Sequence, residues 1–238
     1  MDKLVVIPTY NERENIAPLL EQLLALPLAL EVLIVDDNSP DGTGELVRAR
    51  MAEEPRLHLI ERAAKLGLGS AYVAGFRYAL EHGAQYVIAM DADLSHDPAA
   101  LPEFVRNAEE ADVVLGSRYL RGVSVVNWSF KRLLLSYCAN LYSRLISGLP
   151  LTDATSGYKC FTRRALLGVR LDKLRCDGYA FQIEMSFKCW KRGFSIREIP
   201  IVFVDRRAGV SKIDRRIVWE AALLVWKLRL LSLLNRLE

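Results

Sequence analysis

The chain has 238 residues, of which 51% are hydrophobic and 26% charged, close to the averages for soluble globular proteins. This composition excludes a disordered chain, a collagen and a disulfide scaffold. The 32 basic and 29 acidic residues leave a net charge of +3, which is too small to indicate a nucleic-acid-binding protein. The basic excess lies at the C-terminus, because residues 205–238 contain eight Lys or Arg and four Asp or Glu.

Four cysteines form no Cys-x-x-Cys pair and none lies close to a histidine, so the spacing of a zinc site is absent. We expect reduced thiols in a cytosolic chain. An apolar segment follows Met1-Asp2-Lys3 directly, so we expect no signal peptide. The longest apolar stretch, near residues 221–234, is interrupted by Lys227 and Arg229, so we expect no membrane-spanning helix.

Short apolar runs alternate with helical patterns through the first 120 residues. Strands that are apolar throughout, separated by helices, are typical of a parallel sheet covered on both faces. The patterns predict strands at residues 4–7, 31–35, 57–60, 86–90 and 113–116, and helices at 12–26, 43–54, 67–81 and 99–110.

The second half is less regular but contains no repeat and no Gly/Ser linker, so we expect one continuous domain. Its patterns predict helices at residues 128–146, 181–192 and 214–237, and strands at 158–162 and 196–204.

Polar residues follow four of the predicted strands at the point where each strand ends. In an open α/β sheet, ligands bind outside the carboxyl ends of the strands. Carboxylates gathered at that edge would repel one another unless a cation or ligand donors offset their charge. The four segments are Pro8-Thr9-Tyr10-Asn11-Glu12, Asp36-Asp37, Asp91-Ala92-Asp93 and Gly116-Ser117-Arg118-Tyr119.

The segment Asp91-Ala92-Asp93 has the form Asp-x-Asp. Two carboxylates so spaced at a strand end can hold one hard divalent ion, which in turn binds phosphate oxygens. Asp36-Asp37 has an alternative interpretation as a turn signal, because the turn-forming residues 38–42 follow it.

Three other motifs are excluded. Gly67-Leu68-Gly69 opens a predicted helix but lacks the third glycine of a dinucleotide-binding fingerprint, so a tight turn is the better interpretation. The chain contains no P-loop and no Gly-x-Ser-x-Gly nucleophile elbow.

The three segments Pro8–Glu12, Val35–Thr43 and Met90–His96 resemble the signature blocks of family 2 glycosyltransferases, which have the nucleotide-sugar-binding A-type fold. Later blocks resemble the branch that acts on polyprenyl phosphates, the dolichyl-phosphate mannosyltransferases. The resemblance covers about residues 3–213, so we expect a catalytic domain at 1–213 and a C-terminal helix at 214–238. The later blocks are Gly116–Tyr119, Trp128 with Lys131, Arg132 and Ser136, Asp153–Tyr158, Gly178–Met185, and Val204–Arg206 with Ser211 and Lys212.

The resemblance implies a GDP-mannose donor, a polyprenyl phosphate acceptor and a divalent cation, Mg²⁺ or Mn²⁺. It implies that Asp91, Ala92 and Asp93 meet the diphosphate, ribose and metal, with Asp91 and Asp93 as the metal ligands. Ser95 departs from the family members that carry Gln there, so the metal is expected to take an extra water. The resemblance further implies that the guanosine part is bound by Pro8, Tyr10, Glu12, Val35 and Asp37. The lipid phosphate would be bound by Arg118, Arg132 and Ser136. The donor diphosphate would be bound by Arg206 and Lys212, and Arg118 would also contact the donor.

The implied reaction is a metal-assisted inverting displacement. A phosphate monoester has a second pKa of about 6, so the acceptor is largely dianionic at neutral pH and needs no general base. The protein would stabilise the departing GDP electrostatically. Arg132 and Ser136 are four residues apart, hence on one helix face, although a solvated stripe through Asn140 and Arg144 is an alternative.

Other interpretations stay open at this point. The sugar donor could be UDP-glucose, and the chain could be a catalytically silent lipid- or nucleotide-binding partner. The C-terminal helix could be buried against the sheet or in a homodimer. We favour an interfacial helix, because its apolar surface exceeds one face and the basic excess lies there. The protein would then be peripheral on the cytoplasmic face of a membrane, where a membrane-embedded partner subunit could join it, and would bind no nucleic acid.

Overall fold

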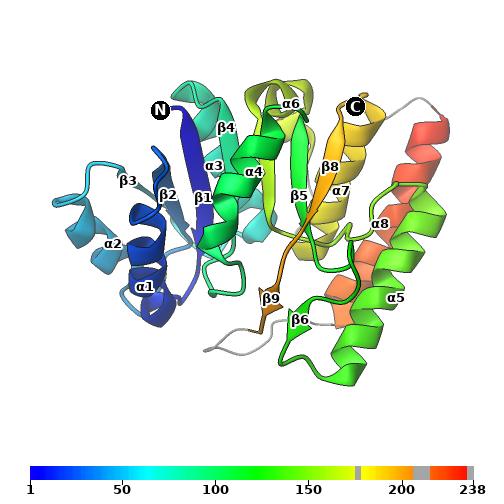
Figure 1. Cartoon of the computed structure of the whole chain (residues 1–238), viewed down its shortest axis with the longest axis horizontal. Helices are drawn as coiled ribbons and strands as arrows, with labels where there is room; N and C mark the ends of the chain where they lie inside the picture. Colours follow the sequence, from blue (N-terminus) through cyan, green and yellow to red (C-terminus); the bar gives the residue numbers. More distant parts are fainter. Residues whose placement is uncertain (175–177, 206–214, 235–238) are drawn as a thin grey trace.

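A mostly parallel sheet forms the centre of the protein, with helices on both faces (Figure 1). The computed structural model describes residues 1–174, 178–205 and 215–234, without the side chains of residues 179 and 215–220. The strand order is β3-β2-β1-β4-β7-β5-β8. The strands are β1 (Lys3–Thr9), β2 (Glu31–Asp36), β3 (Leu57–Glu61), β4 (Tyr86–Ala89), β5 (Val113–Ser117), β7 (Lys159–Thr162) and β8 (Ile196–Pro200).

Helices follow most of the strands in sequence and close both faces of the sheet (Figure 1). They are α1 (Arg13–Leu24), α2 (Thr43–Met51), α3 (Leu68–Glu81), α4 (Leu101–Ala108), α5 (Phe130–Ser147), α6 (Arg163–Gly168), α7 (Gly178–Lys191) and α8 (Arg215–Leu233), with short 3₁₀ turns at Pro98–Ala100 and Leu171–Lys173.

The central strand β1 has apolar side chains on both faces, as its sequence predicts. Val5 and Ile7 pack with α1 and α4, whereas Leu4 and Val6 pack with α3. Successive side chains of a strand point to opposite faces, so an uninterrupted apolar strand must be covered twice. At Gly75 of α3 a Cβ atom would lie 2.2 Å from Val6 Cγ1, so only glycine lets α3 approach β1 this closely. The predicted α/β fold with a mostly parallel sheet is confirmed.

The second half differs from the sequence-based prediction in the direction of β7, in the strand predicted at 196–204, and in β6 and α6, which were not predicted. β7 runs antiparallel to both of its neighbours, β4 and β5. The single strand predicted at 196–204 is wrong: β8 ends at Pro200, and β9 (Phe203–Val204) pairs instead with β6 (Val125–Val126) in a separate two-stranded sheet. The Ile201 N–H still donates to the Ser117 carbonyl oxygen (3.0 Å), and beyond it the Phe203 N–H donates to Ser124 O (3.0 Å), so the chain passes from β5 to the segment of β6.

Helix α8 packs against α5 and α7 along one face (Figure 1). Its residues Leu224, Val225 and Leu228 are buried with Ile183 and Phe187 of α7. Tyr142 of α5 donates a hydrogen bond to the Ala222 carbonyl oxygen, at 3.1 Å. The predicted helix at 214–237 therefore belongs to the packed domain along one face, and residues 214 and 235–238 lie outside the described residues. Among the helices that the structure describes, none combines the length and hydropathy needed to span a bilayer.

Candidate active site

The carboxyl ends of the parallel strands β1, β2, β4 and β5 lie along one edge of the sheet, the lower edge in Figure 1. At the end of β2, the buried carboxylate of Asp36 accepts hydrogen bonds from Thr9 Oγ1 (2.7 Å), Ser39 Oγ (2.6 Å) and Ser39 N (2.9 Å). Asp36 therefore closes the turn after β2, in agreement with the turn interpretation of this residue.

Asp37 joins the end of β2 to the loop before α3. Its buried carboxylate is ion-paired with Arg62 and accepts from the Leu66 N–H (3.0 Å) and the Gly67 N–H (3.2 Å). The same loop places Lys65 Nζ 4.2 Å from the centroid of the Tyr10 ring. A flat aromatic ring and a cation thus lie together at this corner, a combination that can bind a nucleotide base and phosphate.

The other residues predicted to bind guanosine surround the same corner. Pro8 and Val35 are register partners in the β1–β2 ladder. Glu12 precedes α1, where its N–H donates to Thr43 Oγ1 (3.1 Å) and its carboxylate accepts from Asn15 Nδ2 (2.8 Å). The structure therefore brings the five predicted residues together, although their role toward a nucleotide stays a prediction.

The Asp-x-Asp segment follows β4 and is held by side chains that the sequence did not single out. Tyr72 of α3 donates to Asp91 Oδ1 (2.9 Å), and the Asp91 N–H donates to His96 Nδ1 (3.1 Å). His96 is buried and stacked on Tyr158, and burial lowers the pKa of His96, so its ring is neutral and Nδ1 can accept. The residue after Asp93, Leu94, has φ +59°, a left-handed conformation that costs energy in a non-glycine residue.

These residues fit a hard divalent cation. Asp93 Oδ1 accepts from the Ser95 N–H (3.1 Å), and the buried Ser95 hydroxyl has no hydrogen-bond partner among the described residues. Two carboxylates and an unpartnered hydroxyl form an all-oxygen donor set. No cluster of three or more His, Cys, Asp or Glu side chains suited to a metal occurs in the described parts of the chain, so the diphosphate and water would supply the remaining ligands.

Arg118, which follows β5, forms a buried ion pair. Its Nε and Nη2 donate to the two carboxylate oxygens of Asp153, at 2.6 and 2.5 Å, and Nη2 also donates to Thr155 Oγ1 at 2.7 Å. Arg118 is 6% exposed and Asp153 is fully buried. Such bidentate geometry fixes the guanidinium, so Arg118 holds the loop around Asp153 against the end of β5. Its predicted contact with phosphate stays a prediction.

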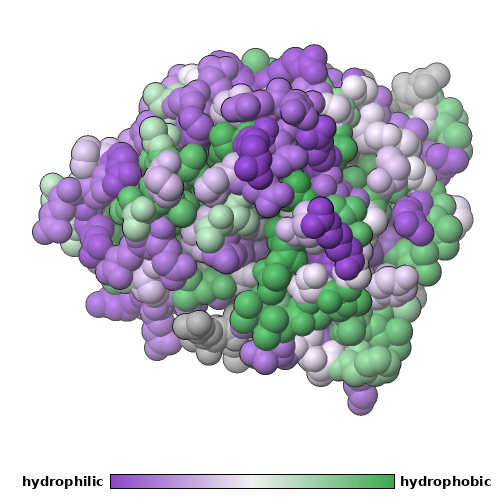
Figure 2. Space-filling view, viewed as in Figure 1, coloured by the Kyte–Doolittle hydropathy of each residue, from purple (hydrophilic) through white to green (hydrophobic). Residues whose placement is uncertain are grey.

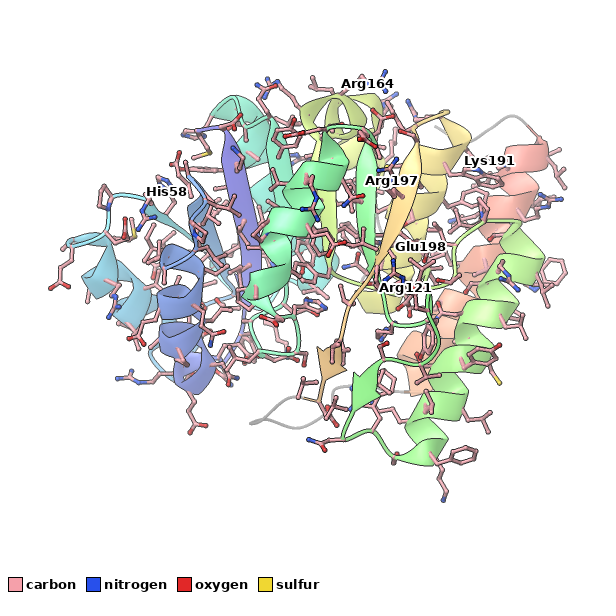
Figure 3. The ribbon with its side chains drawn as sticks, viewed as in Figure 1. His58, Arg121, Arg164, Lys191, Arg197 and Glu198 are labelled. Carbon is pink, nitrogen blue, oxygen red and sulfur yellow. The ribbon has the colours of Figure 1, made fainter. Side chains whose placement is uncertain are left out.

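Glu198 of β8, labelled in Figure 3, supports this loop from the other side. Its carboxylate accepts from the Thr152 N–H (2.9 Å), Thr152 Oγ1 (2.8 Å) and the Asp153 N–H (3.1 Å). Neither Asp153 nor Glu198 was assigned a role by sequence reasoning. Asp153 lies in a block that resembles the family, but nothing in the sequence indicates that its partner is Arg118.

Arg132 and Ser136 lie one turn apart on α5, as predicted, and each meets a residue outside that helix. Arg132 Nη1 donates to Asp205 Oδ1 (2.7 Å), and its guanidinium lies 4.3 Å from the Trp128 ring centroid. Ser136 Oγ accepts from Tyr119 OH (2.8 Å). Within the described residues, both the Arg132 Nε and the Trp128 Nε1 donors are buried without a partner. Arg206 and Lys212 lie outside the described residues.

Comparison with known proteins identifies the family to which the chain belongs. Residues 4–168 match glycosyl transferase family 2, so the chain belongs to this family and is a glycosyltransferase, as the motifs predicted. The chain is 44% identical over 221 residues to an undecaprenyl-phosphate mannosyltransferase of Micrococcus luteus, covering 93% of this chain and 91% of that protein. It is 41% identical over 230 residues to a polyprenol monophosphomannose synthase of Mycolicibacterium smegmatis, covering 95% and 87%.

Solved structures confirm the A-type glycosyltransferase fold. Glucosyl-3-phosphoglycerate synthase of Mycobacterium tuberculosis, in complex with Mn²⁺ and UDP-glucose, superposes with a TM-score of 0.66 over 99% of this chain and 78% of that chain, at 17% identity. A mannosyltransferase of Pyrobaculum calidifontis, in complex with GDP-Man and Mn²⁺, gives a TM-score of 0.58 over 98% and 74%, at 20% identity. At these identities the likeness is one of fold.

Proposed function

We propose that the protein transfers mannose from GDP-mannose to a polyprenyl phosphate. The observation that carries this proposal is the high identity, over nearly the whole chain, to two relatives named for polyprenyl-phosphate mannose synthesis. The site supports it, because the Asp-x-Asp carboxylates and the donors of α5 supply separate places for a diphosphate and for a second phosphate.

In the proposed reaction the acceptor phosphate is its own nucleophile, so the residues of this chain bind and orient two anions. Asp91 and Asp93 would hold a divalent cation, which supplies charge neutralisation to the departing diphosphate when it is bound. Tyr72 and His96 keep the Asp91 segment in one conformation through their hydrogen bonds. Donors fixed before the reaction stabilise developing charge without the cost of reorienting them.

The acceptor phosphate would bind near the start of α5. The side chains of Arg132 and Trp128 are neighbours, and the buried donors Arg132 Nε and Trp128 Nε1 have no hydrogen-bond partner among the described residues. An unsatisfied buried donor costs free energy, which a phosphate oxygen would recover. Ser136 lies one turn further along, so one phosphate could reach from Arg132 to Ser136.

An exposed apolar surface adjoins this phosphate position. On α5 the side chains of Phe130, Leu134, Tyr137, Leu141 and Leu145 are exposed at helical spacing. On the adjacent α8, exposed apolar side chains recur in the same way at Leu223, Trp226, Leu230, Leu233 and Leu234. Figure 2 shows hydrophobic residues gathered over β6, β9 and the lower end of α5. Two apolar stripes side by side fit a bilayer surface, which also contains the acceptor's hydrocarbon tail.

We expect the triple substitution Leu223→Gln, Trp226→Gln, Leu230→Gln to weaken partition onto anionic liposomes at least about tenfold, because each exposed side chain would lose its burial in the interface. Flotation of the full chain measures the bound fraction. Substitution is preferable to removal of α8, since Leu224, Val225 and Leu228 of the same helix belong to the core.

Leu167→Gln provides the matched control, because Leu167 is 62% exposed on α6, away from both stripes. That variant should float like the wild-type protein. Equal flotation of the triple variant and the control would show that the stripes of α5 and α8 do not dock on the bilayer.

Arg132→Ala should raise the KM for polyprenyl phosphate about ten- to a hundredfold, because a charge-assisted hydrogen bond contributes about 1.5–3 kcal/mol. The affinity for GDP-mannose should change little. Initial-rate kinetics with each substrate varied separately measures the two effects. A parallel loss of donor affinity would instead assign Arg132 to the donor side or to the fold, and Lys131→Ala, an exposed neighbour, serves as the control.

Transfer of glucose from UDP-glucose is the second candidate, since structures with UDP-glucose share the fold. The deciding experiment incubates purified protein with polyprenyl phosphate, Mn²⁺ and either GDP-mannose or UDP-glucose. We expect a mannosylated lipid product from GDP-mannose. Product from UDP-glucose alone would replace the proposed donor, and product from neither would contradict the proposed function.

A further inference from the structure

Gly157, in the segment before β7, has no side chain to fill the space between Asp91 and Gln182, and we call this space the hollow. A Cβ atom added at Gly157 would lie 3.4 Å from Asp91 Oδ2 and 3.4 Å from Gln182 Nε2, with no atom nearer. A Cβ atom there would be in ordinary van der Waals contact with both groups, and the missing side chain leaves both groups facing the same space. The carboxylate of Asp91 forms one wall of the hollow, and the side-chain amide of Gln182, from the first turns of α7, forms the other.

The orientation of the Gln182 amide is determined by Lys159. Lys159 Nζ donates to Gln182 Oε1 (2.9 Å) and to the Gln182 backbone oxygen (2.7 Å). Burial lowers the pKa of Lys159 to about 7, but the neutral amine also keeps N–H donors. The amide oxygen must therefore face Lys159, and the NH₂ group must face the hollow.

This NH₂ group has no hydrogen-bond partner among the described residues, although Gln182 is only 3% exposed. Buried polar groups are nearly always partnered, so this orphaned donor calls for a ligand. On the opposite wall, both carboxylate oxygens of Asp91 lie next to Gly157, Oδ2 at 3.4 Å and Oδ1 at 3.5 Å from its Cβ position, and Tyr72 already donates to Oδ1. The hollow thus offers one donor and one acceptor.

A hydroxyl group matches this pair, because it is the common ligand group that accepts and donates at the same oxygen. We propose that the Gln182 amide and the Asp91 carboxylate together bind a hydroxyl of the donor sugar, and that Gln182 determines which sugar is accepted. This inference rests on the proposed function, because it takes the ligand at Asp91 to be a nucleotide sugar. A site that hydrogen-bonds a substrate hydroxyl rejects analogues that lack it far more strongly than an apolar pocket does.

Two substitutions test the role of Gln182. Gln182→Glu keeps the shape of the side chain and an oxygen for Lys159 but removes the NH₂ donor, and Gln182→Met removes the amide without adding charge. Both should weaken GDP-mannose binding about ten- to a hundredfold, while GDP binding stays within about twofold, because GDP lacks the hydroxyls of the mannose ring. Calorimetric titration of both ligands in the presence of Mn²⁺ gives the two dissociation constants.

Ser186→Ala is the matched control, since Ser186 lies one turn further along α7 and also has a buried unpartnered oxygen. This variant should bind both ligands like the wild-type protein. A series of GDP-mannose analogues, each lacking one hydroxyl, identifies the bound group: for one analogue the difference between wild type and Gln182→Met should vanish.

The outcomes separate this inference from the proposed function. Equal weakening of GDP and GDP-mannose in both variants would assign Gln182 to the ribose or to the fold, and unchanged binding of both would mean that only water occupies the hollow. Either result overturns the inference while leaving transfer by the wild-type protein intact. If the wild-type protein uses UDP-glucose instead, the proposed donor fails, and the same comparison with UDP-glucose and UDP still tests Gln182.

Discussion

Asp93→Ala is expected to reduce transfer about a thousandfold or more, because removing the carboxylate forfeits several kcal/mol of charge stabilisation at the diphosphate. Asp93 lies in the segment after β4 and is 9% exposed, and its carboxylate accepts a hydrogen bond from the Ser95 N–H. The fold should survive, since the β4 ladder ends before this residue. Product formation from GDP-mannose with saturating Mn²⁺ measures the loss, and thermal unfolding verifies the fold.

Asp97→Asn is the control for charge, because Asp97 is an exposed carboxylate four residues further along the same loop. We expect near wild-type turnover from this variant. An excess of chelator should abolish turnover by the wild-type protein. Turnover by Asp93→Ala equal to that of wild type, or wild-type turnover in excess chelator, would contradict the metal assignment.

Asp153→Ala should destabilise the protein by about 3–5 kcal/mol, the cost of leaving a buried charge without its partner. Arg118 lies between the rings of Tyr119, Trp128 and Phe203, each 5.5 Å from its guanidinium carbon, so water cannot readily replace the lost carboxylate. Urea denaturation gives the change in the free energy of unfolding.

The exposed pair Arg170–Asp172 is the matched comparison, since both side chains are more than half exposed. Asp172→Ala should leave the free energy of unfolding nearly unchanged, as is usual for exposed ion pairs that water screens. Similar losses in the two variants would show that the Arg118–Asp153 pair does not anchor the loop. A large loss from Asp153→Ala would instead support Arg118 as the residue that positions the loop between α5 and β7.

The residues and elements behind these predictions could be recognised in the sequence to different degrees. The apolar strands, the helices between them and the polar segments at the strand ends were predictable, because side-chain period and strand-end chemistry are local properties. The Asp-x-Asp segment was recognisable for the same reason. β6, α6 and the break after Pro200 were missed, since two-residue strands and single helical turns have too few residues to show a period.

The partners of the site residues were not predictable. Tyr72 is 19 positions from Asp91, and Arg118 is 35 positions from Asp153, so no spacing rule links them. The direction of β7 was not predictable either, because an antiparallel strand inserted between β4 and β5 has the same apolar pattern as a parallel one.

The amino-acid sequence by itself determined the fold class, the family and the edge of the sheet where the candidate site residues gather, because each depends on periodicity or on contiguous motifs. Only the tertiary structure decided which face of α8 is buried, which donors stay unpartnered at Trp128 and Arg132, and that the Gln182 amide faces Asp91 across Gly157. The physical reason is that burial and hydrogen-bond satisfaction depend on what the rest of the chain brings alongside each residue, whereas periodicity and motifs do not.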